Sequence, residues 1–285
     1  MTRRGATAGR AVAARWLLAL LAAAGSGCAS RPAAAPVLSS ERIAAIVASP
    51  DRSAADRTND LRRKPEQMLA FIGLRPGMVA LDLSAGGGYT TELIARSVAP
   101  DGTAYGQSAV RDPSRRPAAP EGAAAPPVAP AASAPTTRTA VALADRAKNP
   151  NAGHIVAVVR PFEDPAPPEL AAGGLDLVTL MFNYHDLGFL GVDRARMNSA
   201  VFAALKPGGL YVIADHAGRD GTGISESGTL HRIEESFLRR EVEAAGFRLA
   251  AEGSFLRNPA DPRDKNTPDP PMPKDEFVLK FVKPS

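Results

Sequence analysis

The chain has 285 residues, with 34 lysines and arginines against 30 acidic residues, a formal charge of +4 and a single cysteine. Four arginines before residue 27 carry the whole excess, because no acidic residue precedes Glu41. The rest of the chain is neutral, so we expect no nucleic-acid partner, since such binding depends largely on neutralising phosphates. One cysteine excludes both an internal disulfide framework and a zinc site built from cysteines.

The N-terminus has the pattern of an export signal. Its arginines are followed by an apolar run over residues 16–24, and then by small residues and Cys28. A positive region, a short apolar core and a small-residue cleavage site are typical of a signal peptide, and a membrane-spanning helix would need about 20 apolar residues. Residues 1–27 are therefore predicted to be a signal peptide.

The single cysteine is also a candidate for lipidation. Its surroundings resemble the lipobox of bacterial lipoproteins, although Gly25 stands where that motif usually has leucine. The resemblance implies a lipid on Cys28 as the only membrane contact, with residues 28–39 as a tether. Cleavage without a lipid is the alternative. The expected location is the cell envelope, as an exported lipoprotein that is anchored to a membrane and faces the periplasm.

Helix-like and strand-like apolar patterns alternate along residues 40–285. Apolar residues recur at helical spacing in five segments, namely 40–49, 65–72, 89–98, 197–205 and 233–245. Strand-like runs occupy six others, namely 78–83, 154–159, 175–181, 210–214, 247–252 and 276–282. Buried strands separated by helices predict an α/β domain with a mostly parallel sheet that helices cover on both faces.

Two segments depart from this alternation. Residues 112–139 are dominated by alanine and proline without apolar periodicity, which predicts a disordered insertion in the domain. A domain boundary there is the alternative. Residues 56–63 are highly charged, which favours a solvated face, with a cover over a ligand pocket as the alternative.

A glycine-rich turn follows the first strand of this domain. Asp82 ends the buried run, Gly86, Gly87 and Gly88 follow, and a helical pattern begins at Tyr89. Glycines without Cβ allow the backbone to approach a ligand at the carboxyl end of a strand, where open α/β sheets place their sites. A dinucleotide fingerprint would need a glycine at position 91, which is threonine, and a phosphate loop would need Gly-Lys-Ser/Thr.

This turn resembles the first motif of class I S-adenosylmethionine-dependent methyltransferases, Asp/Glu-x-Gly-x-Gly-x-Gly. Asp82, Gly86 and Gly88 match it, and Ser84 replaces the first glycine. Further segments support the resemblance, namely KPEQMLAFIGLRPGM, DGTAYGQ, LDLVTLMFNYHDL and ALKPGGLYVIADHAG. The resemblance covers roughly residues 60–285. The chain also resembles a bacterial group of predicted exported methyltransferases. The resemblance implies a Rossmann-like fold with a mostly parallel seven-stranded sheet, and S-adenosyl-L-methionine as cofactor.

The resemblance also assigns cofactor-binding residues. The turn from Asp82 to Gly88, with Ser84 and Gly86, is expected to hold the methionine part of the cofactor. Gln107 ends the second strand, where the family usually has an acid that binds the ribose hydroxyls, and an amide can still bond a hydroxyl. Glu163, with its two neighbours, is a candidate for the adenine pocket on position alone.

The catalytic candidates follow the fourth strand: Asn183, Tyr184, His185 and Asp186. A histidine has a suitable ordinary pKa for a base, and an aspartate can orient it. The alternative is that His185 only caps the strand or bonds the backbone. A second polar group comprises Asp215, His216 and His231, beside a glycine-rich loop over 218–228 that is either a lid or a plain surface loop.

Three histidines near strand ends suggest a metal, but no helical ligand spacing such as H-x-x-x-H occurs, so no metal is expected. The expected function is methyl transfer from S-adenosyl-L-methionine to an unidentified acceptor, a small molecule or another group, by a cell-envelope protein. The main alternative is a non-catalytic envelope lipoprotein that binds a small nucleoside-like ligand, because this cofactor is made in the cytoplasm. A hydrolase using His185 and Asp186 is disfavoured, since no nucleophile-elbow sequence is present.

Overall fold

The computed structural model describes residues 35–109, 135–268 and 271–285. The expected signal peptide, Cys28 and most of the expected tether and insertion therefore lie outside the described residues. Within the described part, no helix has both the length and the apolar character needed to cross a membrane.

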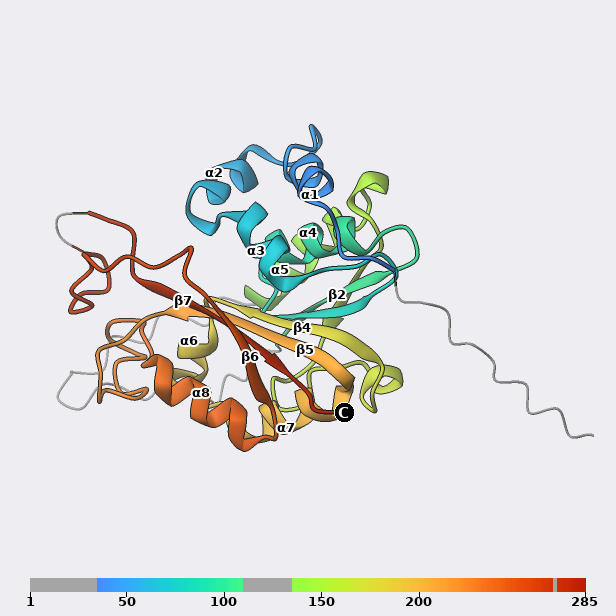
Figure 1. Cartoon of the computed structure of the whole chain (residues 1–285). Coiled ribbons are helices and arrows are strands. Elements are labelled where there is room, and N and C mark those ends of the chain that lie inside the picture. Colours follow the sequence, from blue (N-terminus) through green and yellow to red (C-terminus); the bar gives the residue numbers. More distant parts are fainter. Residues whose placement is uncertain (1–34, 110–134, 269–270) are drawn as a thin grey trace, which may run out of the picture. The chain divides into compact units, whose positions relative to one another are not determined.

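A seven-stranded sheet forms the centre of the domain (Figure 1). The strands are β1 (Val79–Leu83), β2 (Thr103–Ser108), β3 (Ile155–Val159), β4 (Leu175–Met181), β5 (Leu205–His216), β6 (Arg248–Gly253) and β7 (Glu276–Val282). Their order is β3-β2-β1-β4-β5-β7-β6, with β7 antiparallel to both of its neighbours and the other pairs parallel. The expected mostly parallel, seven-stranded sheet is confirmed.

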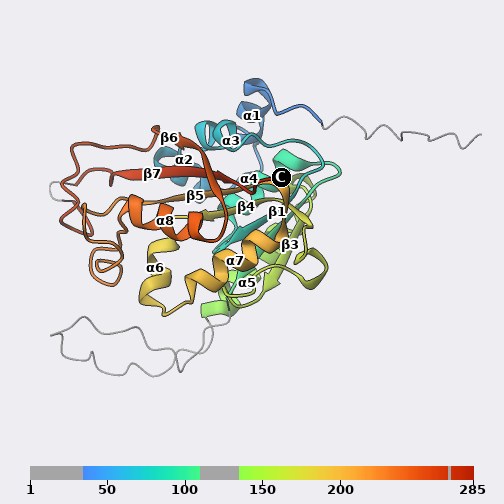
Figure 2. The ribbon, with the colours of Figure 1, turned by 60° about the horizontal axis from the view of Figure 1, so that its bottom comes forward.

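Helices cover both faces of the sheet (Figures 1 and 2). One apolar cluster joins the sheet to α1 (Ser40–Val47), α3 (Pro65–Ile72), α4 (Tyr89–Val98) and Leu143 of α5 (Pro135–Arg146). The other joins it to α6 (Tyr184–Phe189), α7 (Arg194–Ala204) and α8 (Glu235–Ala244). Two short 3-10 turns, Pro150–Ala152 and Pro168–Leu170, precede β3 and β4. Central strands such as β4 are buried on both faces, as their unbroken apolar sequences require.

The chain leaves β1 towards β2 and β3 on one side and later continues through β4 and β5 on the other. The sheet order therefore reverses between β1 and β4, and the carboxyl ends of these parallel strands meet at one edge. In open α/β sheets a ligand binds in the crevice outside such a reversal. This edge carries the glycine-rich turn after β1 and the polar segment after β4.

Three helices were not expected from the sequence. The charged segment forms α2 (Ala54–Arg63), which begins at Ser53, whose side chain accepts a hydrogen bond from the Asp56 N–H at 3.1 Å. The short helix α6 follows β4, and α5 begins at Pro135, inside the range expected to be a disordered insertion. Helix α7 begins at Arg194, about one turn before the expected start, because Asp193 caps it.

Candidate functional site

The glycine-rich turn has the backbone that its sequence requires. Gly86 and Gly88 have φ angles of 55° and 84°, and Ser84 has 53° although it carries a side chain. A Cβ on Gly87 would meet nothing within 4 Å, and one on Gly86 would meet only the Ser84 carbonyl at 4.0 Å. The turn therefore presents an uncovered backbone to the space outside the carboxyl end of β1.

Gly88 has a different reason to lack a side chain. A Cβ there would lie 2.6 Å from Leu143 Cδ1 and 2.9 Å from Arg146 Cδ, both on α5. Arg146 also donates from Nε to the Gly87 carbonyl, and from Nη1 to Asp56 and Glu92. Helix α5 thus packs against the end of the turn and ties it to α2 and α4.

Asp82 lies beneath the turn, 2% exposed. Its two oxygens accept hydrogen bonds from the hydroxyls of Thr91 and Thr179, both at 2.7 Å. Burial raises the pKa of Asp82 to about 6, against the opposing effect of these hydrogen bonds. Both carboxylate oxygens of Asp82 are therefore used in hydrogen bonds within the protein, which join β1 to α4 and β4.

Gln107 occupies the end of β2 but is fully buried. Its Oε1 accepts from the Ser84 N–H at 2.9 Å, and its Nε2 donates to the Arg160 carbonyl at 2.7 Å. The amide therefore links β1, β2 and the residue after β3. The neighbouring hydroxyl of Ser108 is buried without a hydrogen-bond partner in the described part of the chain. Ser108 is a polar group at the expected ribose position that the sequence did not single out.

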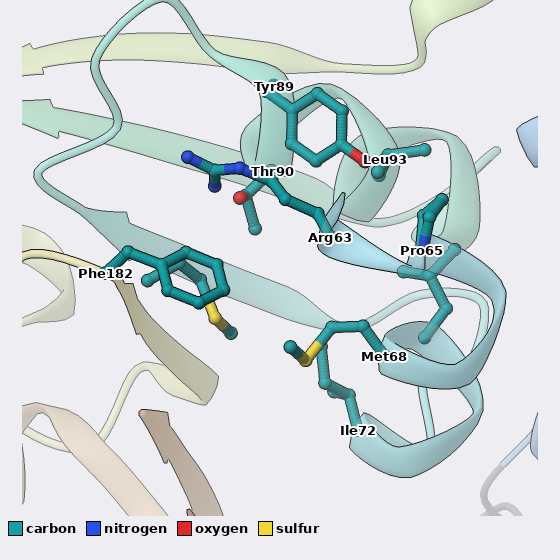
Figure 3. Close-up of a pocket in the computed structure, with 10 residues that line it drawn as sticks. Arg63, Pro65, Met68, Ile72, Tyr89, Thr90, Leu93 and Phe182 are labelled. Atoms are coloured by element: carbon teal, nitrogen blue, oxygen red, sulfur yellow. The ribbon is translucent and has the colours of Figure 1, made fainter. Parts of the chain in front are cut away.

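An apolar pocket lies between α3 and α4, beside the end of β4 (Figure 3). It encloses about 330 Å³ including its open mouth, and Arg63 from the end of α2 lies over it. The Arg63 guanidinium is 5.1 Å from the ring centre of Tyr89 and 4.8 Å from that of Phe182. Its Nε is buried without a hydrogen-bond partner among the described residues, and burial lowers its pKa. Arg63 thus has a donor free for a ligand within the described part of the chain.

Most residues of helix α2 are exposed, as its charges predicted, but Asp56 within it and Arg52 just before it are buried. Arg52 and Asp56 are only 5% and 3% exposed. Arg52 forms a two-pronged ion pair with Asp60 at 2.8 Å, and Asp60 accepts from the Tyr89 hydroxyl at 2.7 Å. Some charges of this segment pair with one another and with α4 and α5, and Arg63 at the end of α2 lines the pocket. The segment is thus an exposed face for most of its length, and only its end lies at the pocket.

The segment after β4 connects directly to the glycine-rich turn. Ser84 Oγ donates to Asn183 Oδ1 at 2.5 Å, and Asn183 Nδ2 donates to Asp186 Oδ2 at 2.8 Å. Asp186 Oδ1 lies 3.1 Å from His185 Nε2 and 2.9 Å from His231 Nδ1. Three of the four catalytic candidates are thus brought together, along with a histidine 45 residues further along the chain.

His185 is held by a second carboxylate. Asp215, fully buried at the end of β5, lies 2.6 Å from His185 Nδ1 and accepts from the His185 N–H at 2.7 Å. Burial disfavours the imidazolium, but Asp215 and Asp186 outweigh it and raise the pKa of His185 to about 9. The expected role of His185 as a base stays a prediction.

Two candidates lie apart from this cluster. Tyr184 is fully buried, and its hydroxyl donates to Glu241 at 2.9 Å and accepts from Asn198 at 2.8 Å. These bonds join its side chain to α7 and α8, and its expected catalytic role stays a prediction. Glu163 is 9% exposed after β3 and accepts from the Asp193 N–H at 3.3 Å. Its expected adenine contact stays a prediction.

No protein-family model and no curated protein matches the chain. Solved structures do resemble it. A SAM-dependent methyltransferase from Aquifex aeolicus is similar with a TM-score of 0.53 and 15% identity, over 86% of this chain and 99% of that one. The YcgJ protein from Bacillus subtilis is similar with a TM-score of 0.50 and 11% identity, over 76% and 97% of the two chains.

The cyclase SpnF is similar too, with a TM-score of 0.51 and 14% identity over 78% of this chain and 82% of that one. At such identities a likeness establishes the fold alone. The Rossmann-like class I methyltransferase fold expected from the sequence is confirmed. Because a cyclase also has this fold, the fold by itself does not decide the reaction.

Proposed function

We propose that the chain is an S-adenosyl-L-methionine-dependent methyltransferase whose cofactor lies over the glycine-rich turn after β1. The observation that carries the proposal is the uncovered backbone at Gly86 and Gly87, placed where the sheet order reverses. Bound there, the cofactor supplies an electrophilic methyl group on its sulfonium. The fold that this chain shares with the methyltransferase from Aquifex aeolicus also supports the proposal.

Two buried polar atoms without a hydrogen-bond partner among the described residues, Arg63 Nε and Ser108 Oγ, are suited to bind such a cofactor. Arg63 Nε has no hydrogen-bond partner within residues 35–109, 135–268 and 271–285, so it is suited to the carboxylate of the methionine part. Ser108 Oγ likewise has no partner among these residues and lies at the end of β2, so it is suited to a ribose hydroxyl. We propose that this hydroxyl replaces the acid that the family usually has there.

The acceptor is proposed to lie at the end of β4, against Asn183 and Asp186. The side chain of Asp186 is 27% exposed, whereas His185 is buried behind it. Methyl transfer asks mainly that the acceptor atom be held in line with the sulfonium methyl. Asn183 is suited to this task because Ser84 and Asp186 fix its amide from both sides.

Calorimetry of the purified full chain with S-adenosylmethionine and S-adenosylhomocysteine tests the proposal. Gly87→Val is the most informative variant, because a Cβ at this position would meet no described protein atom within 4 Å. We expect the native chain to bind and this variant to lose binding while it keeps its circular dichroism spectrum. Leu61→Ala, at a side chain 83% exposed on α2, is the control that keeps binding. No binding by the native chain at millimolar ligand would sink the proposal.

A second candidate function is non-catalytic binding of a nucleoside-like ligand by an envelope lipoprotein. The internal hydrogen bonds of Gln107 favour it, since they leave the end of β2 without a carboxylate for the ribose. Incubation with methyl-labelled cofactor and a cell-envelope extract separates the two. Release of S-adenosylhomocysteine supports the enzyme, whereas binding of adenosine and cofactor without any release supports the binder.

The envelope location is also a proposal, supported by the arginines, apolar run and cysteine of residues 1–28. We propose that Cys28 carries the lipid that anchors the chain. Cys28→Ser should move the protein from the membrane fraction to the soluble fraction and abolish labelling by radioactive fatty acid. Unchanged membrane retention in the variant would exclude a lipid anchor at this residue.

A further inference from the structure

We propose that His185, Asp186 and His231 form a binding site for a divalent transition-metal ion such as Zn²⁺. One donor atom of each residue lies within 4.8 Å of the others. Asp186 Oδ1 stands between the two rings, 3.1 Å from His185 Nε2 and 2.9 Å from His231 Nδ1. Two imidazoles and one carboxylate therefore converge on one volume at the carboxyl edge of the sheet.

Two of the three donor spacings are close to what one ion requires, and all three lie within 4.8 Å. Nitrogen and oxygen ligands lie about 2.0–2.2 Å from zinc, so two of them in tetrahedral geometry are about 3.3 Å apart. The two distances to Asp186 Oδ1 are slightly below this value, and small rotations of the rings would bring both nitrogens to it. Three protein ligands leave one position open for water or for an oxygen or nitrogen atom of a substrate.

The donor set selects a class of metal. Imidazole nitrogen suits zinc, iron, cobalt, nickel and copper, whereas magnesium and calcium prefer oxygen ligands throughout. With two of three donors from His185 and His231, the site favours the first group. Zn²⁺ is the simplest probe, because it has no redox chemistry and binds four ligands tetrahedrally.

The residues behind the ligands are arranged as a metal site needs. Asp215 lies 2.6 Å from His185 Nδ1 and accepts from the backbone N–H of His185 at 2.7 Å. The other ring nitrogen, Nε2, faces Asp186. Asn183 donates to Asp186 Oδ2 at 2.8 Å, which leaves Oδ1 facing the two rings. A carboxylate behind a ligating histidine and a hydrogen bond behind a ligating carboxylate are the usual supports of metal ligands.

The site is also accessible, and its third ligand is held in a rare conformation. The side chain of His185 is 3% exposed and forms the floor, while those of Asp186 and His231 are 27% and 40% exposed. His231 has a φ of 50°, which a residue with a side chain seldom adopts without a local requirement. This backbone brings its ring to Asp186 from a segment far along the chain. His216, 5.3 Å from the His185 ring, faces Glu276 at 2.9 Å and is not part of the set.

Titration of the untagged, chelator-treated full chain with Zn²⁺ in the presence of a chromogenic chelator tests the proposal. The measurement needs neither cofactor nor acceptor, so its outcome is independent of methyl transfer. We expect one zinc per chain and a rise in melting temperature on binding. Removing a ligand with His231→Ala should weaken zinc binding on the order of 100-fold or more, and removing a support with Asp215→Asn should weaken it about 10–100-fold.

His154→Ala is the matched control, because His154 is exposed and its ring lies 2.9 Å from the Thr103 hydroxyl, outside the proposed site. It should bind zinc as the native chain does, and Cys28 is unchanged in every variant. Circular dichroism of His231→Ala without metal verifies its fold. The proposal is overturned if the native chain binds no zinc, which would leave the three residues as ion pairs only. Equal binding by the native chain and His231→Ala, or equal loss in His154→Ala, would overturn it as well.

Discussion

The hydroxyl of Ser84 donates a 2.5 Å hydrogen bond to Oδ1 of Asn183, joining the turn after β1 to the segment after β4. Asn183 passes the connection on to Asp186 at 2.8 Å. A polar chain therefore runs from the proposed cofactor turn to the histidine cluster. It exists because serine, and not glycine, stands at the first glycine position of the motif.

Substitutions at Ser84 should separate the contribution of this hydrogen bond to the unfolding free energy from the cost of backbone strain. Its φ of 53° costs a residue with a side chain about 1 kcal/mol, and the hydrogen bond contributes about 1 kcal/mol. Ser84→Gly loses the bond but relieves the strain, so its unfolding free energy should stay within about 1 kcal/mol of native. Ser84→Ala keeps the strain and should be less stable than Ser84→Gly by about 1 kcal/mol in urea unfolding. An alanine variant as stable as the glycine variant would contradict this account.

The sheet could be predicted from the sequence because its strands are buried. Apolar runs such as 175–181 and 276–282 coincide with the observed β4 and β7. The charged helix α2 could not be predicted in the same way, because no apolar stripe marks it. Its stability depends on partners distant in sequence, such as Arg146 for Asp56 and Tyr89 for Asp60.

The candidate site could be predicted only where its residues are adjacent in sequence. The motif from Asp82 to Gly88 and the group from Asn183 to Asp186 have local signals. Arg63 and Ser108 have no local signal. They are candidates because Arg63 Nε and Ser108 Oγ are buried without a hydrogen-bond partner in the described residues, and only the folded chain shows this. The pKa of His185 likewise depends on Asp215, 30 residues away, which the sequence could not place beside it.

Arg146 should contribute strongly to stability through the two carboxylates that it joins. Its Nη1 lies 2.6 Å from Asp56 and 2.5 Å from Glu92, and both acidic side chains are more than nine-tenths buried. Arg146→Met would leave Asp56 buried without its partner, and we expect a loss of about 2–3 kcal/mol in denaturant unfolding. Lys148→Met is the control, because its pair with Asp145 is exposed and should cost less than about 0.5 kcal/mol. Equal effects of the two variants would exclude this role.

Asp82 should make stability fall as the pH rises from about 4 to about 6. Burial raises its pKa from the ordinary 3.8 to about 6, so the folded state binds the proton more tightly than the unfolded state. Its contribution is fully present below pH 3.8 and is lost as the pH rises through 6, by about 3 kcal/mol for two pKa units. Other carboxylates titrate in the same range, so the quantity to measure is the difference between native and Asp82→Asn unfolding free energies across pH. A difference that does not change between pH 4 and 7 would refute the assignment.

Arg232 should be among the most sensitive positions of the fold. Its side chain is fully buried and donates to the carbonyls of Ala217 and Lys265, and it pairs with Asp261 at 2.9 Å. Removing one partner of a buried ion pair costs about 3–5 kcal/mol, so Arg232→Met should lower the unfolding free energy by that amount. Arg232→Met combined with Asp261→Asn should cost less than the sum of the two single changes, because the second change removes the stranded charge. Additive losses would mean that the pair is not coupled.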